Sequence, residues 1–480
     1  MGKSLKRNYF YNILLNISKV IFPLITAPYI SRVLEPDGVG LFNFANTYSN
    51  YFALVAALGI PLYGVREVAK IKDDIQSLTK FVSEIISLSC ATTFVTTLIY
   101  VCSVFFIPQL SKDYIIFLLI ALGLYTTPFA IDWYFRGREE FGYITLRALI
   151  VRTASVIALF LFVHNKSDLI IYVTIYAFST ITNEIWNFIK MYQHGVHPYF
   201  TLSGIKHLRS LTILFSSSIA ISIYTILDTL MLGFMSNYSE VGYYNCATHI
   251  SRSFTPIVTS LSAVAMPRLA SYIQENKKEE IQAIIDKSFS IVSFLSFPIA
   301  FGVAAIAPIF VPLFFGHLYY GAIIPLQIVI LVVVAVGLNN ITGVQILLGL
   351  GYDKLFLYSV LSGTITNFLL NLLFIPLFGA SGAAFSSVIA EFVILFVMMV
   401  FIIKKTDFCL SETKSFFINL LISLGFFVIV NYLSNVVDGW YLVVIFAAVG
   451  TIYYVGVQYM IKNKAVIILA NVIKYKKNKN

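Results

Sequence analysis

Residues 241–254 read Val-Gly-Tyr-Tyr-Asn-Cys-Ala-Thr-His-Ile-Ser-Arg-Ser-Phe, and they repeat a stretch that occurs earlier in the chain. Residues 39–52, which lie 202 positions earlier (241 minus 39), read Val-Gly-Leu-Phe-Asn-Phe-Ala-Asn-Thr-Tyr-Ser-Asn-Tyr-Phe. The Val, Gly, Asn, Ala, Ser and Phe positions of the two copies coincide. Both copies then continue through an apolar run to a proline, Pro61 in the first and Pro267 in the second. An internal repeat of this length predicts two similar structural units.

The composition indicates a membrane protein. Of the 480 residues, 59% are hydrophobic and only 12% are charged, and the mean hydropathy is +0.85. A soluble protein carries roughly 25% charged residues. The chain therefore cannot build a water-soluble surface, and we expect an all-α polytopic membrane protein.

Apolar runs of roughly 20 residues, each long enough to cross a hydrocarbon core of about 30 Å as a helix, recur along the chain. Prolines inside them predict kinks, because neighbouring helices can satisfy the carbonyl groups that a proline frees. We predict about fourteen transmembrane helices, at 9–33, 38–62, 81–107, 114–134, 143–163, 168–190, 211–235, 239–265, 284–313, 322–348, 355–376, 380–403, 414–434 and 439–461.

The repeat sets the order of these helices. Helix 1 corresponds to helix 7 and helix 2 to helix 8, so the repeating unit has six helices. An even number keeps both copies in the same orientation, which predicts two lobes related by an axis along the membrane normal, with a central cleft between them. The predicted divisions are an N-lobe at 1–200, a C-lobe at 201–405, two additional helices at 406–462 and a basic tail at 463–480.

The distribution of lysine and arginine predicts the orientation. If the links between helices are numbered alternately from the N-terminus, one set of links contains most of the basic residues, and the other contains only Arg32, Lys112 and Lys166. By the positive-inside rule, both termini lie in the cytoplasm. The net charge of +10 is then a topology signal and an attraction to anionic lipid, and it does not indicate nucleic-acid binding.

Polar residues follow one face of helix 2 and the equivalent face of helix 8. Asn43, Asn46 and Asn50 are spaced as one stripe of a helix. A polar stripe in hydrocarbon faces either water or the interior of a bundle, so these residues line the cleft or form hydrogen bonds within a lobe. Arg252 favours the cleft, because a charge deep in the membrane is costly. The corresponding stripe in helix 8 is Asn245, Thr248, His249 and Arg252.

Further charged residues fall inside predicted helices. Lys19 and Arg152 are candidates for the cleft, although the stem of Lys19 could instead reach the cytoplasmic surface. Arg32 ends helix 1 on the outer side, where it could form a lip of the cleft or pair with a nearby carboxylate. Asp228 and Glu391 are candidate carriers of a coupling proton or sodium ion. The three remaining carboxylates near cytoplasmic helix ends are expected to be interfacial: Glu84, Asp132 and Glu184.

No pattern of catalytic chemistry is present. The predicted outer links are too short to hold an active site, and the sequence contains neither a glycine-rich phosphate loop nor a His/Cys spacing typical of metal sites. We therefore expect neither an enzyme nor a resident metal or other cofactor.

Several motifs together resemble one family of transporters. They are the basic start Lys-Ser-Leu-Lys-Arg-Asn, Pro-Tyr-Ile-Ser-Arg-Val-Leu-Glu-Pro-Asp-Gly-Val-Gly at 28–40, Asp-Thr-Leu-Met-Leu-Gly from Asp228, Val-Gly-Tyr-Tyr-Asn-Cys-Ala from Val241, Pro267-Arg268 and Phe-Gly-Ala-Ser-Gly-Ala-Ala at 378–384. The chain resembles the Wzx-type polysaccharide-biosynthesis flippases of the multidrug/oligosaccharidyl-lipid/polysaccharide exporter superfamily.

The resemblance implies a flippase in the cytoplasmic membrane of a bacterium. Such a protein moves a polyprenyl-pyrophosphate-linked oligosaccharide to the outer leaflet by alternating access, without ATP, for O-antigen or capsule-type synthesis. It also implies a cationic cavity for the pyrophosphate, and a polymerase and glycosyltransferases as partners in the pathway. Three other functions remain open at this point: a drug/cation antiporter, a lipid II flippase, and a membrane-embedded polymerase or ligase.

Overall fold

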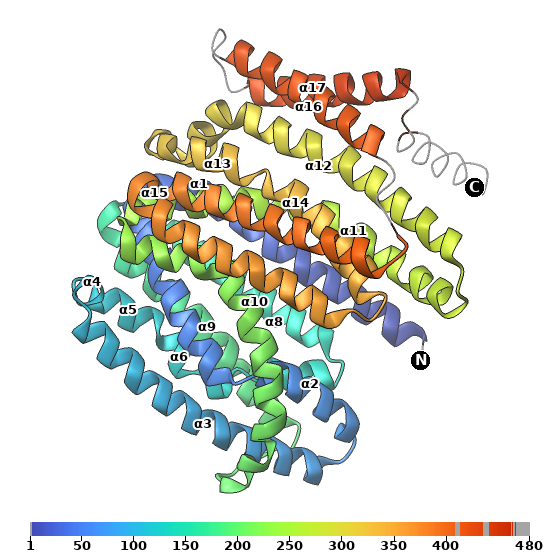
Figure 1. Cartoon of the computed structure of the whole chain (residues 1–480). Helices are drawn as coiled ribbons and strands as arrows, with labels where there is room; N and C mark the ends of the chain where they lie inside the picture. The colour runs from blue at the N-terminus through green and yellow to red at the C-terminus, as the bar shows by residue number, and fades with distance from the viewer. Residues whose placement is uncertain (1, 409–412, 435–440, 462, 464–465, 467–480) are drawn as a thin grey trace. The chain divides into compact units, whose positions relative to one another are not determined.

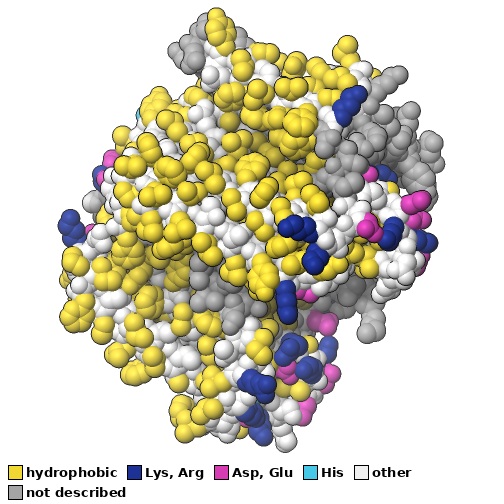
Figure 2. All heavy atoms as spheres, viewed as in Figure 1, with side chains coloured by type: hydrophobic (Ala, Val, Ile, Leu, Met, Phe, Trp, Pro, Cys, Tyr) yellow, Lys and Arg dark blue, Asp and Glu magenta, His cyan; other side chains and the backbone are white. Residues whose placement is uncertain are grey.

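The computed structural model describes residues 2–408, 413–434, 441–461, 463 and 466, and these residues form helices and short connections without a β-strand (Figure 1). The chain divides into two compact units, Met1–Ser239 and Glu240–Asn480. A helix bundle in lipid presents apolar side chains on its outer surface, and hydrophobic side chains cover much of the face seen in Figure 2.

The first unit begins with a long helix that breaks at one residue. Within α1 (Gly2–Ala57), Glu35 has φ 59° and ψ 174°, a conformation outside the helical region. Pro36 follows directly, and a proline disfavours the helical conformation of the residue before it. The break falls between the two segments predicted at 9–33 and 38–62. The other helices of this unit are α2 (Ile60–Ile71), α3 (Ile75–Phe106), α4 (Pro108–Ser111), α5 (Tyr114–Ile120), α6 (Leu122–Tyr125), η1 (Thr127–Phe129), α7 (Asp132–Gly137), α8 (Phe141–Phe162), η2 (Lys166–Asp168), α9 (Leu169–Gln193), η3 (Leu202–His207) and α10 (Leu208–Met235).

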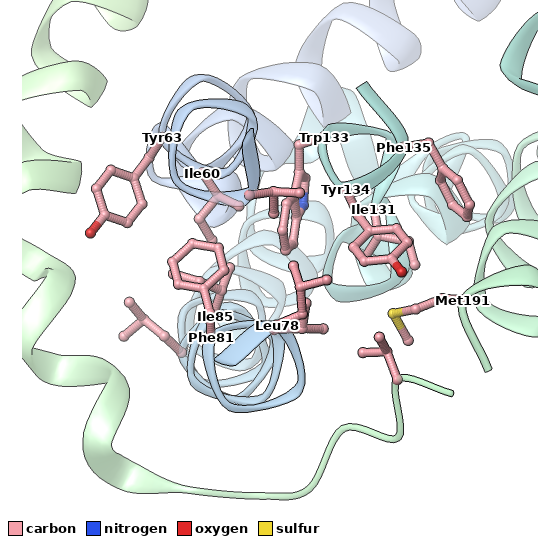
Figure 3. Close-up of a cluster of buried hydrophobic side chains, with 14 of the residues drawn as sticks. Ile60, Tyr63, Leu78, Phe81, Ile85, Ile131, Trp133, Tyr134, Phe135 and Met191 are labelled. Atoms are coloured by element: carbon pink, nitrogen blue, oxygen red, sulfur yellow. The ribbon is translucent and has the colours of Figure 1, made fainter. Parts of the chain in front are cut away.

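An aromatic cluster joins α2, α3 and α7 in the first unit. Phe81 and Trp133 meet edge to face with ring centroids 6.0 Å apart, an arrangement that aromatic pairs prefer. A side chain at Gly64 would collide with the ring of Trp133, so glycine lets α2 and α7 approach closely. The cluster is shown in Figure 3, where Ile60, Leu78, Ile85, Tyr134 and Met191 surround these rings.

The second unit contains a second long helix with an internal break. Within α15 (Asp353–Lys405), Gly379 has φ 53°, in the left-handed region that favours glycine. The Glu240 carboxylate accepts a hydrogen bond of 2.6 Å from the amide of Ala380, the first residue after the break. A carboxylate at the start of a helix is stabilised by the helix dipole, and a side chain at position 379 would collide with it. The other helices are α11 (Tyr238–Gln274), α12 (Lys278–Phe315), η4 (His317–Ala322), α13 (Ile323–Val329), α14 (Val332–Asn339), the π-helix η5 (Asn340–Leu348), α16 (Thr413–Ser434) and α17 (Tyr441–Met460).

A network of uncharged polar side chains attaches the last two helices to α12. The amide of Asn419 on α16 donates to Ser293 Oγ on α12 at 3.0 Å, and its oxygen accepts from Gln458 on α17 at 2.7 Å. Asn463 adds hydrogen bonds to both amides. These side chains are buried, so the network fixes α16 and α17 against α12 (Figure 1).

Eight helices in the described part of the chain are long and apolar enough to cross a membrane. Two of them, α1 and α15, contain the breaks at Glu35 and Gly379 and so extend over two predicted segments each. The all-helical membrane fold is therefore confirmed, whereas the number fourteen and the symmetry of the lobes remain predictions.

Candidate functional site

A cavity of about 310 Å³ lies among α1, α8 and α9 in the first unit. This volume is at the lower end of the roughly 300–1,000 Å³ typical of small-molecule sites. Two of the predicted site residues, Lys19 and Arg152, line this cavity although 133 residues separate them (152 minus 19). The rest of its polar lining consists of Ser18, Thr26, Ser155, Tyr172, Tyr176 and Ser179.

The two basic residues give the cavity a positive charge. One guanidinium N–H of Arg152 donates to Ser18 Oγ at 2.6 Å, and Ser18 in turn donates to the carbonyl of Leu15. Lys19 is close enough to Arg152 to interact with it electrostatically. Among the described residues, neither cation forms an ion pair. Because a guanidinium has five donors and an ammonium three, the cavity can offer several charge-assisted hydrogen bonds to an anion.

One residue of the asparagine stripe of helix 2 forms a hydrogen bond with a residue that lines this cavity. Tyr176, which lines the cavity, donates from its hydroxyl to Asn46 Oδ1 at 3.1 Å. Asn43 instead donates to the carbonyl of Val39, one turn back in its own helix. Asn50 is exposed. The structure therefore brings Lys19 and Arg152 to one cavity, and Asn46 is connected to it through Tyr176, whereas Asn43 and Asn50 are not.

The second copy of the repeat reproduces one detail of the first. Asn245 donates to the carbonyl of Val241 at 2.8 Å, as Asn43 does to Val39 at 2.9 Å. His249 and Arg252 are exposed, whereas Thr248, which directly precedes His249, is buried and donates to the carbonyl of Tyr244. The equivalent asparagines thus have the same local role, which is to satisfy a helix carbonyl within their own unit.

Arg32 is exposed near the break in α1. Glu35 pairs with Lys166 at 2.7 Å, and Asp37 accepts a hydrogen bond from Ser239. The ion pair connects the link that contains Glu35 with the link that contains Lys166. The distribution of basic residues predicts that both links lie on the outer side of the membrane.

The two candidate ion carriers have different surroundings. Asp228 on α10 is partly buried and acts electrostatically on Tyr51. Glu391 on α15 is only 7% exposed, and it accepts a hydrogen bond of 2.7 Å from the side chain of Asn339.

Two glutamates that were expected at the membrane surface are buried. Glu84 is 3% exposed, because Lys206 and His207 of the link before α10 cover it and pair with its two oxygens at 2.7 and 2.9 Å. Glu184 is 8% exposed. Their position at the membrane interface remains a prediction. Counting residues from a helix end gives depth along the helix, but it does not reveal what packs against its side.

A second cavity, of about 380 Å³, lies in the second unit among α11, α12, α16 and α17. Its lining is almost entirely apolar, and the small residues Gly302 and Gly450 leave room in it. Such a cavity suits a hydrocarbon chain, because burying apolar surface is favourable. The apolar and aromatic lining includes Phe254, Phe294, Pro298, Ile306, Phe426 and Val455.

In the described residues, no group of three or more His, Cys, Asp or Glu side chains could hold a metal ion. Of the two cavities, one is small, cationic and rich in hydroxyl groups, and the other is apolar.

Comparisons with known proteins agree with these features. Residues 5–273 match the family model described as polysaccharide biosynthesis protein. A protein of Escherichia coli (strain K12) named as an O-antigen transporter is 27% identical over 403 residues, covering 83% of this chain and 97% of that protein. Among solved structures, the lipid II flippase MurJ in an inward closed conformation superposes with a TM-score of 0.71 at 16% identity, over 98% of this chain and all of that one. An inward-facing multidrug resistance MATE family transporter gives a TM-score of 0.59 at 12% identity, over 86% and 95% of the two chains.

Proposed function

We propose that this chain is a flippase for a lipid-linked oligosaccharide, because it belongs to the polysaccharide biosynthesis protein family. It moves a polyprenyl-pyrophosphate-linked repeat unit from the cytoplasmic to the outer leaflet by alternating access, for synthesis of a surface polysaccharide. The E. coli relative named as an O-antigen transporter supports this substrate class.

The cationic cavity of the first unit is the observation that carries the proposal. A pyrophosphate cannot cross hydrocarbon unaided, because desolvating its charges costs many kcal/mol. Lys19 and Arg152 supply donors that can replace water around it, and the guanidinium of Arg152 fits two phosphate oxygens at once. The hydroxyl groups of Ser155 and Ser179 add uncharged hydrogen-bonding groups for phosphate or sugar.

The polar stripes extend the proposed path of the head group. Arg252 is a second guanidinium for the pyrophosphate, and His249 and Asn245 lie on the same helix face. Asn43, Asn46 and Asn50 offer amide groups to the sugars from the equivalent helix, and Arg32 stands at the outer end. Their role as lining of the cleft follows from the repeat and their helical spacing.

The apolar cavity of the second unit is proposed to hold part of the polyprenyl tail. An isoprenoid chain is uncharged and can remain in lipid, so the protein needs only an apolar surface beside the path of the head group. The polar network around Asn419 keeps the walls of this cavity together.

Coupling to an ion is proposed for Asp228 and Glu391. Carboxylates inside the membrane are rare and mark ion or proton pathways. The ion is a proton or a sodium ion, and no other cofactor is proposed.

The proposed architecture has fourteen spans, with lobes at 1–200 and 201–405, helices 13 and 14 at 406–462 and a basic tail at 463–480. Both termini are placed in the cytoplasm of a bacterial cell. The proposed partners are the lipid bilayer, a polysaccharide polymerase and the glycosyltransferases that assemble the repeat unit.

Deletion of the gene in its own bacterium tests this function. Surface polysaccharide should fall to background, because the repeat unit can no longer reach the outer leaflet, while the lipid-linked repeat unit accumulates. Expression of the wild-type chain should restore both quantities. Unchanged surface polysaccharide in the deletion strain, with no rise in the lipid-linked unit, would contradict the proposal.

A further inference from the structure

A short motif in the sixth predicted helix, at 168–190, recurs in the twelfth predicted helix, at 380–403, which is the sixth of the predicted C-lobe. Residues 177–184 read Ala-Phe-Ser-Thr-Ile-Thr-Asn-Glu, and residues 384–391 read Ala-Phe-Ser-Ser-Val-Ile-Ala-Glu. Four positions are identical, and Thr/Ser and Ile/Val are close replacements. The two stretches are 207 residues apart (391 minus 184). The internal repeat therefore extends to these helices, and it makes Glu184 and Glu391 equivalent residues.

The burial of the two helices follows the same register. Ala177 and Ala384 are 1% and 0% exposed, and Met191 and Met398 are 0% and 1% exposed. Glu184 and Glu391 lie on this buried face, at 8% and 7% exposure. A glutamate is almost never buried to this extent without a compensating partner. Two such residues at equivalent positions of a repeat indicate a shared role.

Glu184 lacks a cation of its own. The charged groups that act on it are Asp132 of α7 and Arg147 of α8, and the Thr126 hydroxyl is within hydrogen-bonding range. Arg147 is already paired with Asp132 at 2.8 Å, and Asn187 donates to the same carboxylate oxygen. The buried Oε2 atom of Glu184 has no hydrogen-bond partner among the described residues. The site thus contains two carboxyl groups, Asp132 and Glu184, and an arginine that is already paired with Asp132.

The buried side chain of Asn187 adds a second sign of an incomplete site. Asn187 is 2% exposed and lies one helical turn beyond Glu184. Its side-chain oxygen is also buried without a partner in the described structure, as is that of Asn183. Buried polar atoms without partners are uncommon and costly, so a group that donates a hydrogen bond is expected here.

Glu391 likewise has no charged partner among the described residues. Its side chain is 7% exposed, and its Oε2 atom accepts from Asn339 at 2.7 Å. Asn339 ends α14, and the π-helix η5 begins at Asn340. The side-chain oxygens of both asparagines are buried without partners in this part of the structure. π-Helical turns inside longer helices occur frequently at functional sites.

We propose that Glu184 and Glu391 form a pair of repeat-related proton-binding sites, one in each unit. In each site a proton from water binds a carboxylate oxygen and forms a neutral O–H group, and the reverse step returns the proton to water. The neutral form fits the buried state, because an isolated ionised carboxylate in this environment would be far more costly. The assignment of Glu184 is independent of the substrate. The use of both protons to drive transport rests on the proposed function.

A proton fits these sites better than a metal cation. A bound divalent cation commonly takes several carboxylate ligands, and the described residues contain no group of three or more acidic, His or Cys side chains that could hold one. At Glu391 the Asn339 side chain presents an N–H to the carboxyl, which would repel a cation at that oxygen.

Infrared spectroscopy of the purified full-length protein in lipid nanodiscs tests the assignment. A protonated carboxyl has a C=O band that shifts in D2O, and at pH 7 the wild type should show this band. Glu184→Gln and Glu391→Gln should each lose about half of the band that the double variant loses completely. Glu84→Gln is the matched control, because Glu84 is equally buried but ionised through Lys206 and His207, and it should leave the band unchanged.

A band of equal intensity in the wild type and the double variant would overturn the proposal, as would the absence of any band in the wild type at pH 7. If either glutamine variant fails to fold, Glu184→Asp and Glu391→Asp keep a carboxyl and should shift the band without removing it. The measurement uses no glycan, so its outcome is independent of the proposed substrate. A missing band would contradict the proton sites alone, and a loss of export with a normal band would leave the proton sites unaffected.

Discussion

Replacing Arg152 with alanine is expected to reduce surface polysaccharide to the level of a strain that lacks the protein. The side chain supplies the guanidinium of the cationic cavity, and Ser18 holds it in place. Without it, Lys19 alone faces the pyrophosphate, and the loss of a charge-assisted bidentate contact lowers the affinity for the head group. Arg152→Lys keeps the charge but not the planar fork, so it should retain part of the export. The measurement is the amount of surface polysaccharide per cell at equal protein level.

Lys19→Ala should have the same direction of effect, because it removes the other cation of the cavity. Arg66→Ala is a suitable control, since Arg66 is an exposed arginine outside the cavity, paired with Glu67. Its export should match the wild type. Wild-type export in both Arg152→Ala and Lys19→Ala would show that this cavity does not bind the pyrophosphate. Arg252 would then be the next residue to test as its binding group.

Asp132→Ala is expected to give the largest loss of stability among the residues discussed here. Arg147, only 4% exposed, would lose its ion pair, and the buried amide of Asn187 would lose its acceptor. Breaking a fully buried pair typically costs ~3–5 kcal/mol, but the Asp132 side chain is 44% exposed and water can partly replace it, so we expect about 2–3 kcal/mol. The measurement is the thermal unfolding midpoint of the purified protein in detergent.

Asp132→Asn keeps one accepting oxygen and should fall between the wild type and Asp132→Ala. The exposed Asp73 provides a matched control, and Asp73→Ala should leave the midpoint unchanged. An Asp132→Ala protein as stable as the wild type would show that the Asp132–Arg147–Asn187 contacts contribute little to the fold.

The sequence was sufficient to predict the helical membrane fold, because long apolar runs with few charges have no other stable arrangement in lipid. The repeat between 39–52 and 241–254 also predicted that equivalent positions would have comparable roles, and Asn43 and Asn245 form the same hydrogen bond. The breaks at Glu35 and Gly379 fall between predicted segments, where a proline follows and where a glycine is required.

The grouping of site residues could not be predicted from spacing alone. Lys19 and Arg152 lie on different helices, and only the packing of α1 against α8 and α9 brings them to one cavity. Similarly, the place of Glu184 along its helix did not reveal that neighbouring segments bury its side chain. The signal that could have identified Glu184 was the repeated Ala-Phe-Ser motif, which makes it equivalent in the repeat to Glu391.

The fraction of the lipid-linked oligosaccharide that lies in the outer leaflet is the most direct test of the flippase function. In spheroplasts of cells that assemble the repeat unit but lack the polymerase, a membrane-impermeant reagent that modifies the glycan reaches only the outer leaflet. If the chain is the flippase, most of the lipid-linked oligosaccharide should be modified when the wild-type chain is present. When the chain is depleted, almost none should be modified, although its total amount rises. An equal modified fraction with and without the chain would contradict the flippase function.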